Sequence, residues 1–436
     1  MTDPDLPLHA QSATALAALL RAGECTAMDA VQSCLERISQ VDAKVQAWTF
    51  LDPELALKQA HAADRHRASG AALGALHGVP VGIKDIIDTM DMPTENGTVL
   101  HAGRRPAKDA TVVARLRAAG AIIMGKTVTT ELATYFPGKT RNPHDPEHTP
   151  GGSSSGSAAA VAANMVPLAV GTQTNGSVIR PAAFCGVVGY KPTYGLINRD
   201  GVLCQSPAMD QIGVFARTPE DAALIAESLC DAVALPRWLD ASGGLQPRLP
   251  RMAFVKTPVW NRTAFDAREA IVGLAARLGA AVHEVDMPEA AAHGWDWQRT
   301  AMEAEIATHY DAEWTRGRGQ LSQSLCSQIE RGRAVTAVDY QHALAQIPRI
   351  NAAFEPLYAE YDVIMTPAVA GTAPRGLDST GDPAFCTLWT FCGMPSLTLP
   401  LLRGTNGLPL GVQLVAPRFC DAQLLRAARW LCDAVR

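Results

Sequence analysis

The sequence predicts an α/β fold in which a sheet is covered by helices on both of its faces. Short apolar runs typical of buried strands alternate along the chain with segments of helical periodicity. That alternation is characteristic of sheets flanked by helices. The chain has 436 residues, of which 47% are hydrophobic and 19% are charged, as in an ordinary globular enzyme. This length suits one large domain or two fused domains.

The first half of the chain begins with helices and continues with strands. Residues 9–40 have the composition and spacing of two helices, separated by the sequence AGECT at positions 22–26. A helical pattern over 109–120 begins at Asp109, which we expect to cap that helix. Apolar runs predict strands at 78–89 (GVPVGIKDIIDT), 121–125 (AIIMG) and 167–174 (PLAVGTQT).

The second half follows a long connection. Residues 233–252 are rich in Pro, Gly and Leu and lack periodicity, so we expect a surface segment there. Helical patterns dominate residues 295–359. The remaining predicted elements are strands at 252–255, 280–286, 361–369, 394–401 and 408–416, with helices near 264–279 and from about 421.

Composition disfavours several classes of function. The net charge is −5 and no basic block is present, so we expect no nucleic-acid partner and no binding to an anionic membrane. The acidic start MTDPDLPLHA lacks the features of a signal peptide, and no apolar run approaches the roughly 18 residues of a spanning helix. Ten cysteines without a CxxC pair are typical of reduced thiols, and we expect a cytoplasmic protein.

Histidines and cysteines form no pattern with the spacing of a zinc site. His144 and His148 lie in a proline-rich loop without a third ligand nearby, so we expect them to be surface residues. We predict neither a metal ion nor an organic cofactor.

Two short motifs match catalytic signatures, but neither has the required context. Gly120–Thr127 (GAIIMGKT) fits the phosphate-loop pattern, yet its four middle residues form a predicted strand that would use their N–H groups. We therefore expect Lys126 to be structural. Gly152–Gly156 (GSSSG) fits the nucleophile elbow with Ser154 at its centre, but a loop precedes it where an elbow needs a strand.

A serine-rich run at 151–160 (GGSSSGSAAA) and a later turn both suggest chemistry. Taken alone, the run is typical of the serine-capped start of a helix. Ser177, however, follows a Thr-Asn-Gly turn after the predicted strand at 167–174. Asn175 and Gly176 tolerate unusual backbone angles, so this turn can direct successive N–H groups at one oxyanion. Ser177 is therefore a candidate nucleophile.

Lys84 is a candidate base for that nucleophile. It lies within the apolar run VPVGIKDII, between Ile83 and the pair Ile86 and Ile87. Burial lowers the pKa of a lysine, which can then act as a neutral base. A lysine on a solvated face is the simpler alternative. The S-x-x-K motif of penicillin-binding proteins does not occur in the chain.

Five motifs together resemble the amidase signature family of serine hydrolases. They are GVPVGIKD around Lys84, GGSSSGSAAAVAA from Gly151, GTQTNGSVIRPAAFCGVVGYKPT from Gly171, SPAMDQIGVFART at 206–218, and MPSLTLPL with LPLGVQLVA near the C-terminus. The resemblance spans nearly the whole chain. It implies a single large α/β domain over 1–436, built around a mixed, twisted sheet. The implied parts are N-terminal helices at about 9–44, a catalytic core at about 60–232, and a C-terminal half at 253–436 that completes the sheet and the substrate pocket.

The resemblance also implies a Ser–Ser–Lys triad without a cofactor. Ser177 corresponds to the nucleophile and Lys84 to the base, while Ser153 corresponds to the bridging serine, held through a cis peptide bond. The remaining serines, 154–157, are then expected to build the loop and to cap the next helix. The implied oxyanion hole consists of the backbone N–H groups of Thr174, Asn175, Gly176 and Ser177.

The chain departs from the usual family motif around the nucleophile. The usual motif has Asp four residues before the nucleophile and Arg two residues after it, where this chain has Gln173 and Ile179. Arg180 lies three residues after the nucleophile, and Asn175 replaces the first glycine of the oxyanion loop. Losing an acid and a base together leaves neither buried and unpaired. Asn can adopt the left-handed conformation, so we expect the turn and the triad to remain.

Three functions fit these residues. The first is a stand-alone amidase acting on small or aryl amides, with carbamates and ureas as close variants, which includes aryl acylamidase and urethanase activity. The second is a component of a tRNA-dependent amidotransferase, which the acidic balance, Gln173 and Ile179 disfavour. The third is a non-catalytic binding protein on the same scaffold, and the complete Lys–Ser–Ser set disfavours it. A homodimer is compatible with all three.

Candidate substrate-binding residues come from two segments. In the family that the chain resembles, the stretch after GKT borders the active site, which points to Ala133, Thr134 and Tyr135. The sequence TLWTFCGMP of the C-terminal half also supplies candidates, although a core position is favoured for the first two of them: Trp389, Phe391 and Cys392.

Overall fold

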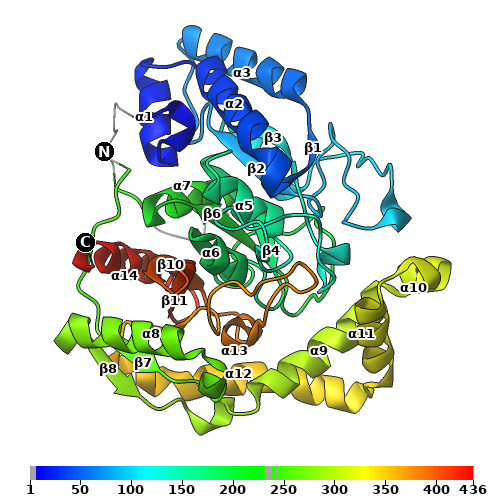
Figure 1. Cartoon of the computed structure of the whole chain (residues 1–436), viewed down its shortest axis with the longest axis vertical. Helices are drawn as coiled ribbons and strands as arrows, with labels where there is room; N and C mark the ends of the chain where they lie inside the picture. Colours follow the sequence, from blue (N-terminus) through cyan, green and yellow to red (C-terminus); the bar gives the residue numbers. More distant parts are fainter. Residues whose placement is uncertain (1–5, 231–237, 241–242, 436) are drawn as a thin grey trace.

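The computed structural model describes residues 6–230, 238–240 and 243–435 of the chain (Figure 1). Its strands form one eleven-stranded sheet in the order β1-β3-β2-β4-β6-β5-β10-β11-β9-β7-β8. The strands are β1 (Trp48–Leu51), β2 (Pro80–Lys84), β3 (Ile122–Thr127), β4 (Leu168–Gln173), β5 (Val188–Lys191), β6 (Gln211–Ala216), β7 (Met252–Val255), β8 (Val282–Val285), β9 (Val363–Pro367), β10 (Ser396–Arg403) and β11 (Pro409–Val415).

The sheet mixes parallel and antiparallel pairs. Toward one end β2 lies parallel to both β3 and β4, and toward the other end β7 lies parallel to both β9 and β8. The strands between them, from β4 to β9 in sheet order, all pair antiparallel, and β1 adds an antiparallel edge. The predicted α/β fold with a mixed sheet is confirmed.

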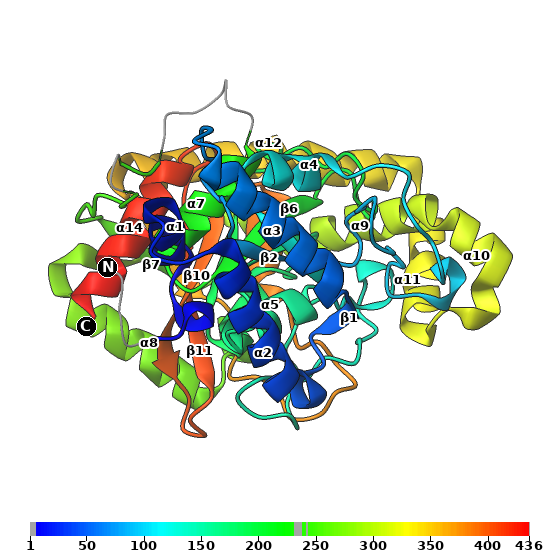
Figure 2. The same ribbon diagram turned by 90° about the horizontal axis from the view of Figure 1, so that it is seen from above.

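Helices gather at the two ends and on the faces of this sheet. Figure 1 shows α1–α3 at the opposite end of the molecule from α9–α12, and both Figures 1 and 2 show α10 and α11 projecting to one side. The helices are α1 (Ala13–Ala22), α2 (Ala27–Val45), α3 (Pro53–Ala68), α4 (Thr111–Ala118), α5 (Ser155–Ala162), α6 (Ile179–Cys185), α7 (Pro219–Leu229), α8 (Phe265–Leu278), α9 (Gly294–His309), α10 (Asp311–Gly317), α11 (Gln323–Ala334), α12 (Ala337–Glu360), α13 (Ala384–Phe391) and α14 (Asp421–Ala434).

Helices cover both faces of the sheet. Gly189 and Tyr190 are successive residues of β5, so their side-chain positions point to opposite faces. A Cβ atom at Gly189 would lie 2.5 Å from Cβ of Ala182 on α6, so glycine lets α6 approach closely. On the other face, the Tyr190 hydroxyl donates a 2.6 Å hydrogen bond to Asp421 at the start of α14. Helix α5 packs beside α6, and α7 packs beside α14.

Most sequence-predicted elements are present, with corrections to their bounds. The strand expected at 78–89 covers only Pro80–Lys84, and the helix expected at 109–120 begins at Thr111. Asp109 does not cap that helix; its carboxylate accepts a 2.8 Å hydrogen bond from the N–H of Met90 and pairs with Arg117. The expected connection at 233–252 falls partly outside the described residues, and Met252 already belongs to β7.

The phosphate-loop match lies in a strand, as expected. Residues Ile122–Thr127 form β3, which pairs with β1 and β2. Lys126 is fully buried, donates a 2.8 Å hydrogen bond to the carbonyl of Ile87, and lies 3.4 Å from the Asp85 carboxylate. Lys126 therefore connects β3 to the segment after β2. Within the described part of the chain, none of the helices combines the length and apolarity needed to cross a membrane.

Candidate active site

Two parallel strands bring Lys84 and Thr172 together. Ile83 of β2 pairs with Val170 of β4, so these strands end side by side at one edge. Lys84 is the last residue of β2, and Thr172 is the penultimate residue of β4. The Nζ atom of Lys84 lies 2.8 Å from Oγ1 of Thr172. Strand pairing therefore fixes the first contact of the lysine.

Lys84 is a buried amine that forms no ion pair with any carboxylate of the described residues. Its side chain is fully buried, and its Nζ atom lies 2.7 Å from Oγ of Ser153. Burial lowers the pKa of Lys84 well below its ordinary value, although the charge of Asp210 acts in the opposite direction. A neutral amine at this position can accept a proton from Ser153.

The carboxylate of Asp210 is engaged by other groups. One oxygen accepts a 2.5 Å hydrogen bond from the hydroxyl of Thr174. Thr174 begins the oxyanion loop, which is the segment 174–178 between β4 and α6 that holds the predicted oxyanion hole. The other oxygen pairs with Arg199 at 2.6 Å and accepts the backbone N–H groups of Gln205 and Ser206. Asp210 is therefore positioned by its own partners and does not contact Lys84.

Ser153 and Ser154 have different environments. The Ser154 hydroxyl donates a 3.0 Å hydrogen bond to the carbonyl of Thr172 and accepts the N–H of the same residue at 3.2 Å. Ser154 is thus bound to the backbone of β4, whereas Ser153 contacts Lys84. Of these two neighbours, only Ser153 is placed to exchange a proton with the lysine.

The remaining serines of the run support strands and do not cap α5. No side-chain capping bond is formed at Ser154, the residue that precedes this helix. The Ser157 hydroxyl donates a 3.0 Å hydrogen bond to the carbonyl of Val170 and shares a 2.7 Å hydrogen bond with Thr127. The expected capping role is wrong because these hydroxyls are used by buried groups of the sheet.

Two glycines lead the chain into Ser153. Gly151 and Gly152 have φ angles of 81° and 60°, in the left-handed region that glycine adopts without steric cost. The cis peptide bond implied by the resemblance is absent, because the described part of the chain contains only trans peptide bonds. The glycine pair turns the chain at this position instead.

Ser177 lies against this glycine turn. A Cβ atom at Gly152 would be 3.2 Å from Cα of Ser177, so a larger residue at position 152 would crowd the serine. The Ser177 side chain is 9% exposed, which leaves it at the edge of the buried site. No hydrogen bond joins Ser177 to Ser153 in the described residues, and such catalytic contacts often tighten only when substrate binds.

The oxyanion loop between β4 and α6 is closed by a chain of hydrogen bonds. The side-chain oxygen of Gln173 accepts the N–H groups of Val178 (2.8 Å) and Ile179 (3.0 Å), at the far end of the loop. The side-chain nitrogen of Gln173 donates to the Thr390 hydroxyl at 2.8 Å, and that hydroxyl donates to the carbonyl of Asn175 at 2.6 Å. The loop is therefore held at both ends and at its middle.

The two departures from the usual family motif fit this arrangement. Gln173 is neutral and uses both ends of its amide, so it needs no basic partner. Ile179 is fully buried in an apolar cluster that includes Phe184, Val369 and Cys386. A charged side chain at position 179 would be buried among apolar groups, which costs several kcal/mol.

The segment after β3 presents Tyr135 to the oxyanion loop. Leu132 and Ala133 have φ angles of 45° and 58°, which are unusual for residues other than glycine and often occur at functional sites. The conformation is held in part by the Tyr310 hydroxyl, which donates to the carbonyl of Leu132 at 2.7 Å. The side-chain nitrogen of Asn175 donates a 3.0 Å hydrogen bond to the Tyr135 hydroxyl.

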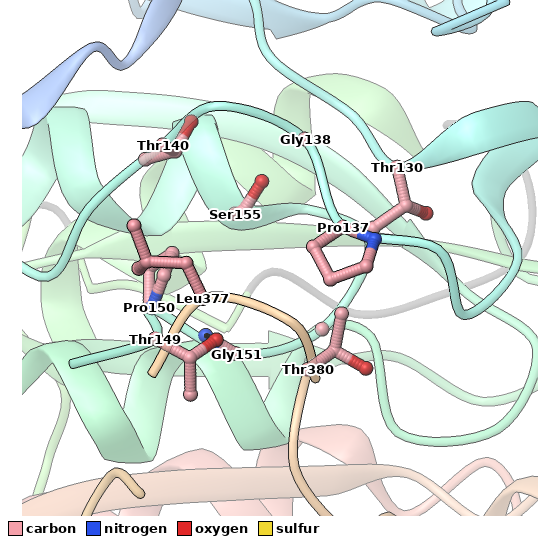
Figure 3. A pocket seen from close by; sticks show the side chains of 11 residues that line it. Thr130, Pro137, Gly138, Thr140, Thr149, Pro150, Gly151, Ser155, Leu377 and Thr380 are labelled. Atoms are coloured by element: carbon pink, nitrogen blue, oxygen red, sulfur yellow. Dashed lines mark hydrogen bonds between the residues drawn. The ribbon is translucent and has the colours of Figure 1, made fainter. Parts of the chain in front are cut away.

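Two pockets adjoin the glycine turn and Tyr135. Figure 3 shows the first, whose lining includes Thr130, Pro137, Gly151 and Thr380. The second shares Pro137 and Thr380 with it and is also lined by Tyr135. Of the three candidate substrate-binding residues in this segment, Tyr135 therefore lines a pocket. The other two, Ala133 and Thr134, are buried beside it.

The candidates of the C-terminal half lie in the hydrophobic core. Trp389 and Phe391 are each 1% exposed, and the ring of Trp389 packs 5.6 Å from that of Phe354. This agrees with the core position that the sequence favours for both. Cys392 is buried in the same cluster, and a contact with substrate there stays a prediction.

The two histidines of the proline-rich loop bind other groups of the protein. His144 is exposed, and its ring lies 2.9 Å from the carbonyl of Cys185, whereas His148 is half-buried and lies 3.1 Å from the carboxylate of Asp145. The described residues contain no group of three or more His, Cys, Asp and Glu side chains arranged as metal ligands.

Sequence reasoning missed three supporting residues. Thr172 lies inside the motif that carries Ser177, and Asp210 lies inside SPAMDQIGVFART, so both were within reach of the motif analysis. Thr390 lies between Trp389 and Phe391. It is 215 residues from Asn175, and no local sequence pattern connects positions so far apart.

Comparisons with known proteins agree with this geometry. A family model described as Amidase matches residues 29–425. A glutamyl-tRNA(Gln) amidotransferase component from Chloroflexus aurantiacus is 35% identical, over 96% of this chain and 95% of its own length. A crystal structure of an amidase superposes with a TM-score of 0.86 at 29% identity, covering 97% of this chain and 99% of that one. The peptide amidase from Stenotrophomonas maltophilia superposes with a TM-score of 0.82 at 29% identity, covering 97% and 96%.

Replacing Thr172 with valine is expected to change the pH profile of amide hydrolysis. We expect activity to fall with decreasing pH as Lys84 gains a proton, so that the acid limb of kcat/KM follows the pKa of Lys84. Valine removes an oxygen that accepts a hydrogen bond from the protonated amine, so the pKa decreases further and the limb moves to lower pH.

The control for this experiment is Thr366→Val. Thr366 is a buried threonine that donates to the carbonyl of Val255, away from the lysine. This variant should keep the acid limb where it is in the parent. A limb that stays in place or moves to higher pH in Thr172→Val would contradict the assignment of Lys84 as the titrating group.

Replacing Thr390 with valine is expected to lower kcat by about tenfold or more, because the oxyanion loop loses its central support. KM should change by less than about threefold and the acid limb should not move, since Thr390 lines neither of the two pockets and does not bind Lys84. Steady-state kinetics with Thr366→Val as the matched threonine control measures both effects. An unchanged kcat, or equal losses in both variants, would remove Thr390 from the support of the loop.

Proposed function

This chain belongs to the amidase family, and we propose that it hydrolyses the C–N bond of a small or aryl amide through an acyl intermediate on Ser177. One observation carries the proposal. The buried Nζ atom of Lys84 lies 2.7 Å from Oγ of Ser153, and Ser177 adjoins the turn that precedes Ser153. An amine kept neutral by burial, a relay serine and a serine at the edge of the buried site make up a base and its nucleophile.

The first step forms the acyl–enzyme. Neutral Lys84 accepts a proton from Ser153, which accepts the proton of Ser177 as the Ser177 oxygen attacks the amide carbonyl. The carbonyl oxygen becomes an oxyanion and is bound by backbone N–H groups of residues 174–177. The C–N bond then breaks as the relay returns the proton to the departing nitrogen.

The second step restores the enzyme. A water molecule gives a proton to the same relay and attacks the ester carbonyl of acyl-Ser177. The bond between the acyl carbon and the Ser177 oxygen breaks, and that oxygen takes the proton back. The net reaction consumes one amide and one water and releases one carboxylic acid and one amine. Carbamates and ureas can follow the same steps, so aryl acylamidase and urethanase activities are variants of this proposal.

A component of a tRNA-dependent amidotransferase is the second candidate. The curated relatives named as glutamyl-tRNA(Gln) amidotransferase components favour it, since they align with 96% of the chain. The neutral pair Gln173 and Ile179 and the net charge of −5 favour the stand-alone amidase. Copurification with other amidotransferase proteins and release of ammonia from glutamine would support the amidotransferase. Turnover of simple amides by the isolated chain, without glutaminase activity, would support the amidase.

Labelling with a fluorophosphonate probe tests the catalytic proposal directly. Such probes react covalently with activated serines, so the parent should be labelled at one residue, Ser177. Ser177→Ala should lose labelling and turnover while keeping its thermal unfolding temperature, because a hydroxyl at the edge of the site adds little packing. A parent that is never labelled would favour a non-catalytic binding protein. Labelled Ser177→Ala would place the nucleophile elsewhere.

A substrate panel then distinguishes the classes of C–N bond. Anilides, aliphatic amides, carbamates and ureas are compared at one enzyme concentration. We expect the highest kcat/KM on an amide. A higher kcat/KM on a carbamate or a urea would identify that class as the preferred substrate instead.

Ser153 and Ser154 provide a matched pair of variants for the relay. Ser153→Ala should lose more kcat/KM on an amide than on an activated ester of the same acyl group, because a basic amine needs the proton that the relay supplies. Ser154→Ala should be milder and affect both substrates alike, since this hydroxyl binds the backbone of β4.

Kinetics of both variants on such an ester–amide pair check the expectation. Equal losses of Ser153→Ala on the two substrates would remove Ser153 from protonation of the leaving group. An inactive Ser154→Ala beside an active Ser153→Ala would overturn the triad.

A further inference from the structure

Arg180 is a buried cation close to the nucleophile without an acidic partner. Its side chain is 1% exposed. The guanidinium donates to the carbonyl of Gly381 at 2.8 Å and to the hydroxyl of Thr380 at 3.3 Å, while its Nε atom has no partner. Among the described residues, no carboxylate forms an ion pair with it. Two neutral acceptors therefore serve a group that carries five N–H donors.

This arrangement differs from those of the other buried cations near the sheet. Lys126 has the Asp85 carboxylate at 3.4 Å. Lys191 has no such partner, but burial lowers its pKa to about 7, so it can lose its charge. Arginine does not lose its proton in proteins, and a buried charge without a partner costs several kcal/mol. The site thus retains a positive charge that its own side chains do not neutralise.

The position of Arg180 relates this charge to the reaction. Its N–H donates a 3.0 Å hydrogen bond to the carbonyl of Gly176, which forms the first turn of α6. Arg180 lies three residues after Ser177, in the first turn of α6, which begins at Ile179. The two acceptors of Arg180, Thr380 and Gly381, line the pocket that Tyr135 also lines. The guanidinium therefore forms hydrogen bonds with two residues that line this pocket.

The acidic groups nearby do not fill the role of a counter-charge. Asp382 pairs with Arg262 at 3.1 Å, and Asp378 lines the pocket but is exposed to solvent. Gln173 is neutral and Ile179 is apolar, although both flank the nucleophile. A carboxylate brought by a ligand is the group that this site lacks, and it would be a stronger acceptor than a carbonyl or a hydroxyl.

We infer that Arg180 binds a carboxylate on the acyl part of the substrate, so that the preferred substrates are amides whose acyl chain carries a second, ionised carboxyl group a few bonds from the scissile carbonyl. This inference rests on the proposed acyl transfer to Ser177. In such a substrate the carboxylate pairs with the guanidinium and takes over from Thr380 or Gly381, while the amide carbonyl lies at the oxyanion loop. Hydrolysis of succinamate, for example, consumes water and gives succinate and ammonia.

Paired substrates of equal length test the inference. The monoamides malonamate, succinamate and glutaramate are compared with the corresponding neutral diamides. The parent should prefer at least one monoamide over its diamide by about tenfold or more in kcat/KM, as expected for a charge-assisted hydrogen bond. Arg180→Met should reduce this ratio to within about threefold of one, and Arg180→Lys should retain part of it. Arg217→Met, which changes a half-buried arginine that donates to the carbonyl of Val166, should leave the ratio as in the parent.

Protection from fluorophosphonate labelling gives a readout that does not need turnover. Malonate, succinate and glutarate should slow labelling of the parent more than acetate or propionate does, and Arg180→Met should abolish this difference. A parent that hydrolyses diamides as fast as monoamides, and is not protected by any dicarboxylate, overturns the inference but leaves the amidase function in place. A parent that is neither labelled nor active on any amide overturns the proposed function itself. Equal losses on both substrates in Arg180→Met would assign Arg180 to structure alone.

Discussion

The burial of Lys84 without an ion pair is the constraint on which the rest of the site depends. A lysine at the end of β2 that met solvent or a carboxylate would keep its proton and could not serve as a base. Lys126 on the neighbouring strand shows the alternative, because the Asp85 carboxylate lies 3.4 Å from its amine. Within the described residues, the amine of Lys84 instead forms hydrogen bonds with two hydroxyls, those of Ser153 and Thr172. Asp210, whose charge acts to raise the pKa of Lys84, is engaged by Thr174 and Arg199. Burial therefore lowers the pKa of Lys84 and favours the neutral amine, which can accept a proton.

The oxyanion loop depends on a second constraint, which comes from the topology of the sheet. Strands β5 and β10 are neighbours, so the chain of the C-terminal half returns to the nucleophile and places α13 beside it. From α13, Thr390 reaches both Gln173 and the carbonyl of Asn175. Thr387 of the same helix donates to the side chain of Asn175 at 2.7 Å. The Asn and Gln of the sequence QTNGS are therefore parts of a neutral network. This network explains how the loop persists without the acid and base of the usual family motif.

The sequence was informative where local pattern and motif coincide. The strands that carry Lys84 and Gln173 and the turn at Ser177 follow from apolar runs broken by glycine and asparagine. The capping role of the serines after Ser153 could not be judged from the sequence, since Ser154 and Ser157 bind carbonyls of β4 that only the tertiary fold brings near. The strands Trp48–Leu51 and Val188–Lys191 were not predicted, although Met252–Val255, which has the same length, was. The environment of Arg180 is equally a property of the fold, since its acceptors lie 200 and 201 residues further along the chain.

The most direct measurement of the central claim is the titration of Lys84 itself. Lysine side chains labelled with ¹³C at Cε report the protonation of the amine by NMR, and comparison with Lys84→Met assigns the signal. Because burial dominates its environment, Lys84 should titrate well below the ordinary lysine value of 10.5, separately from the exposed lysines. The same signal should remain in Ser177→Ala, in which turnover cannot interfere. A Lys84 that stays protonated up to the ordinary value would contradict the account, because the two serines would then have no base.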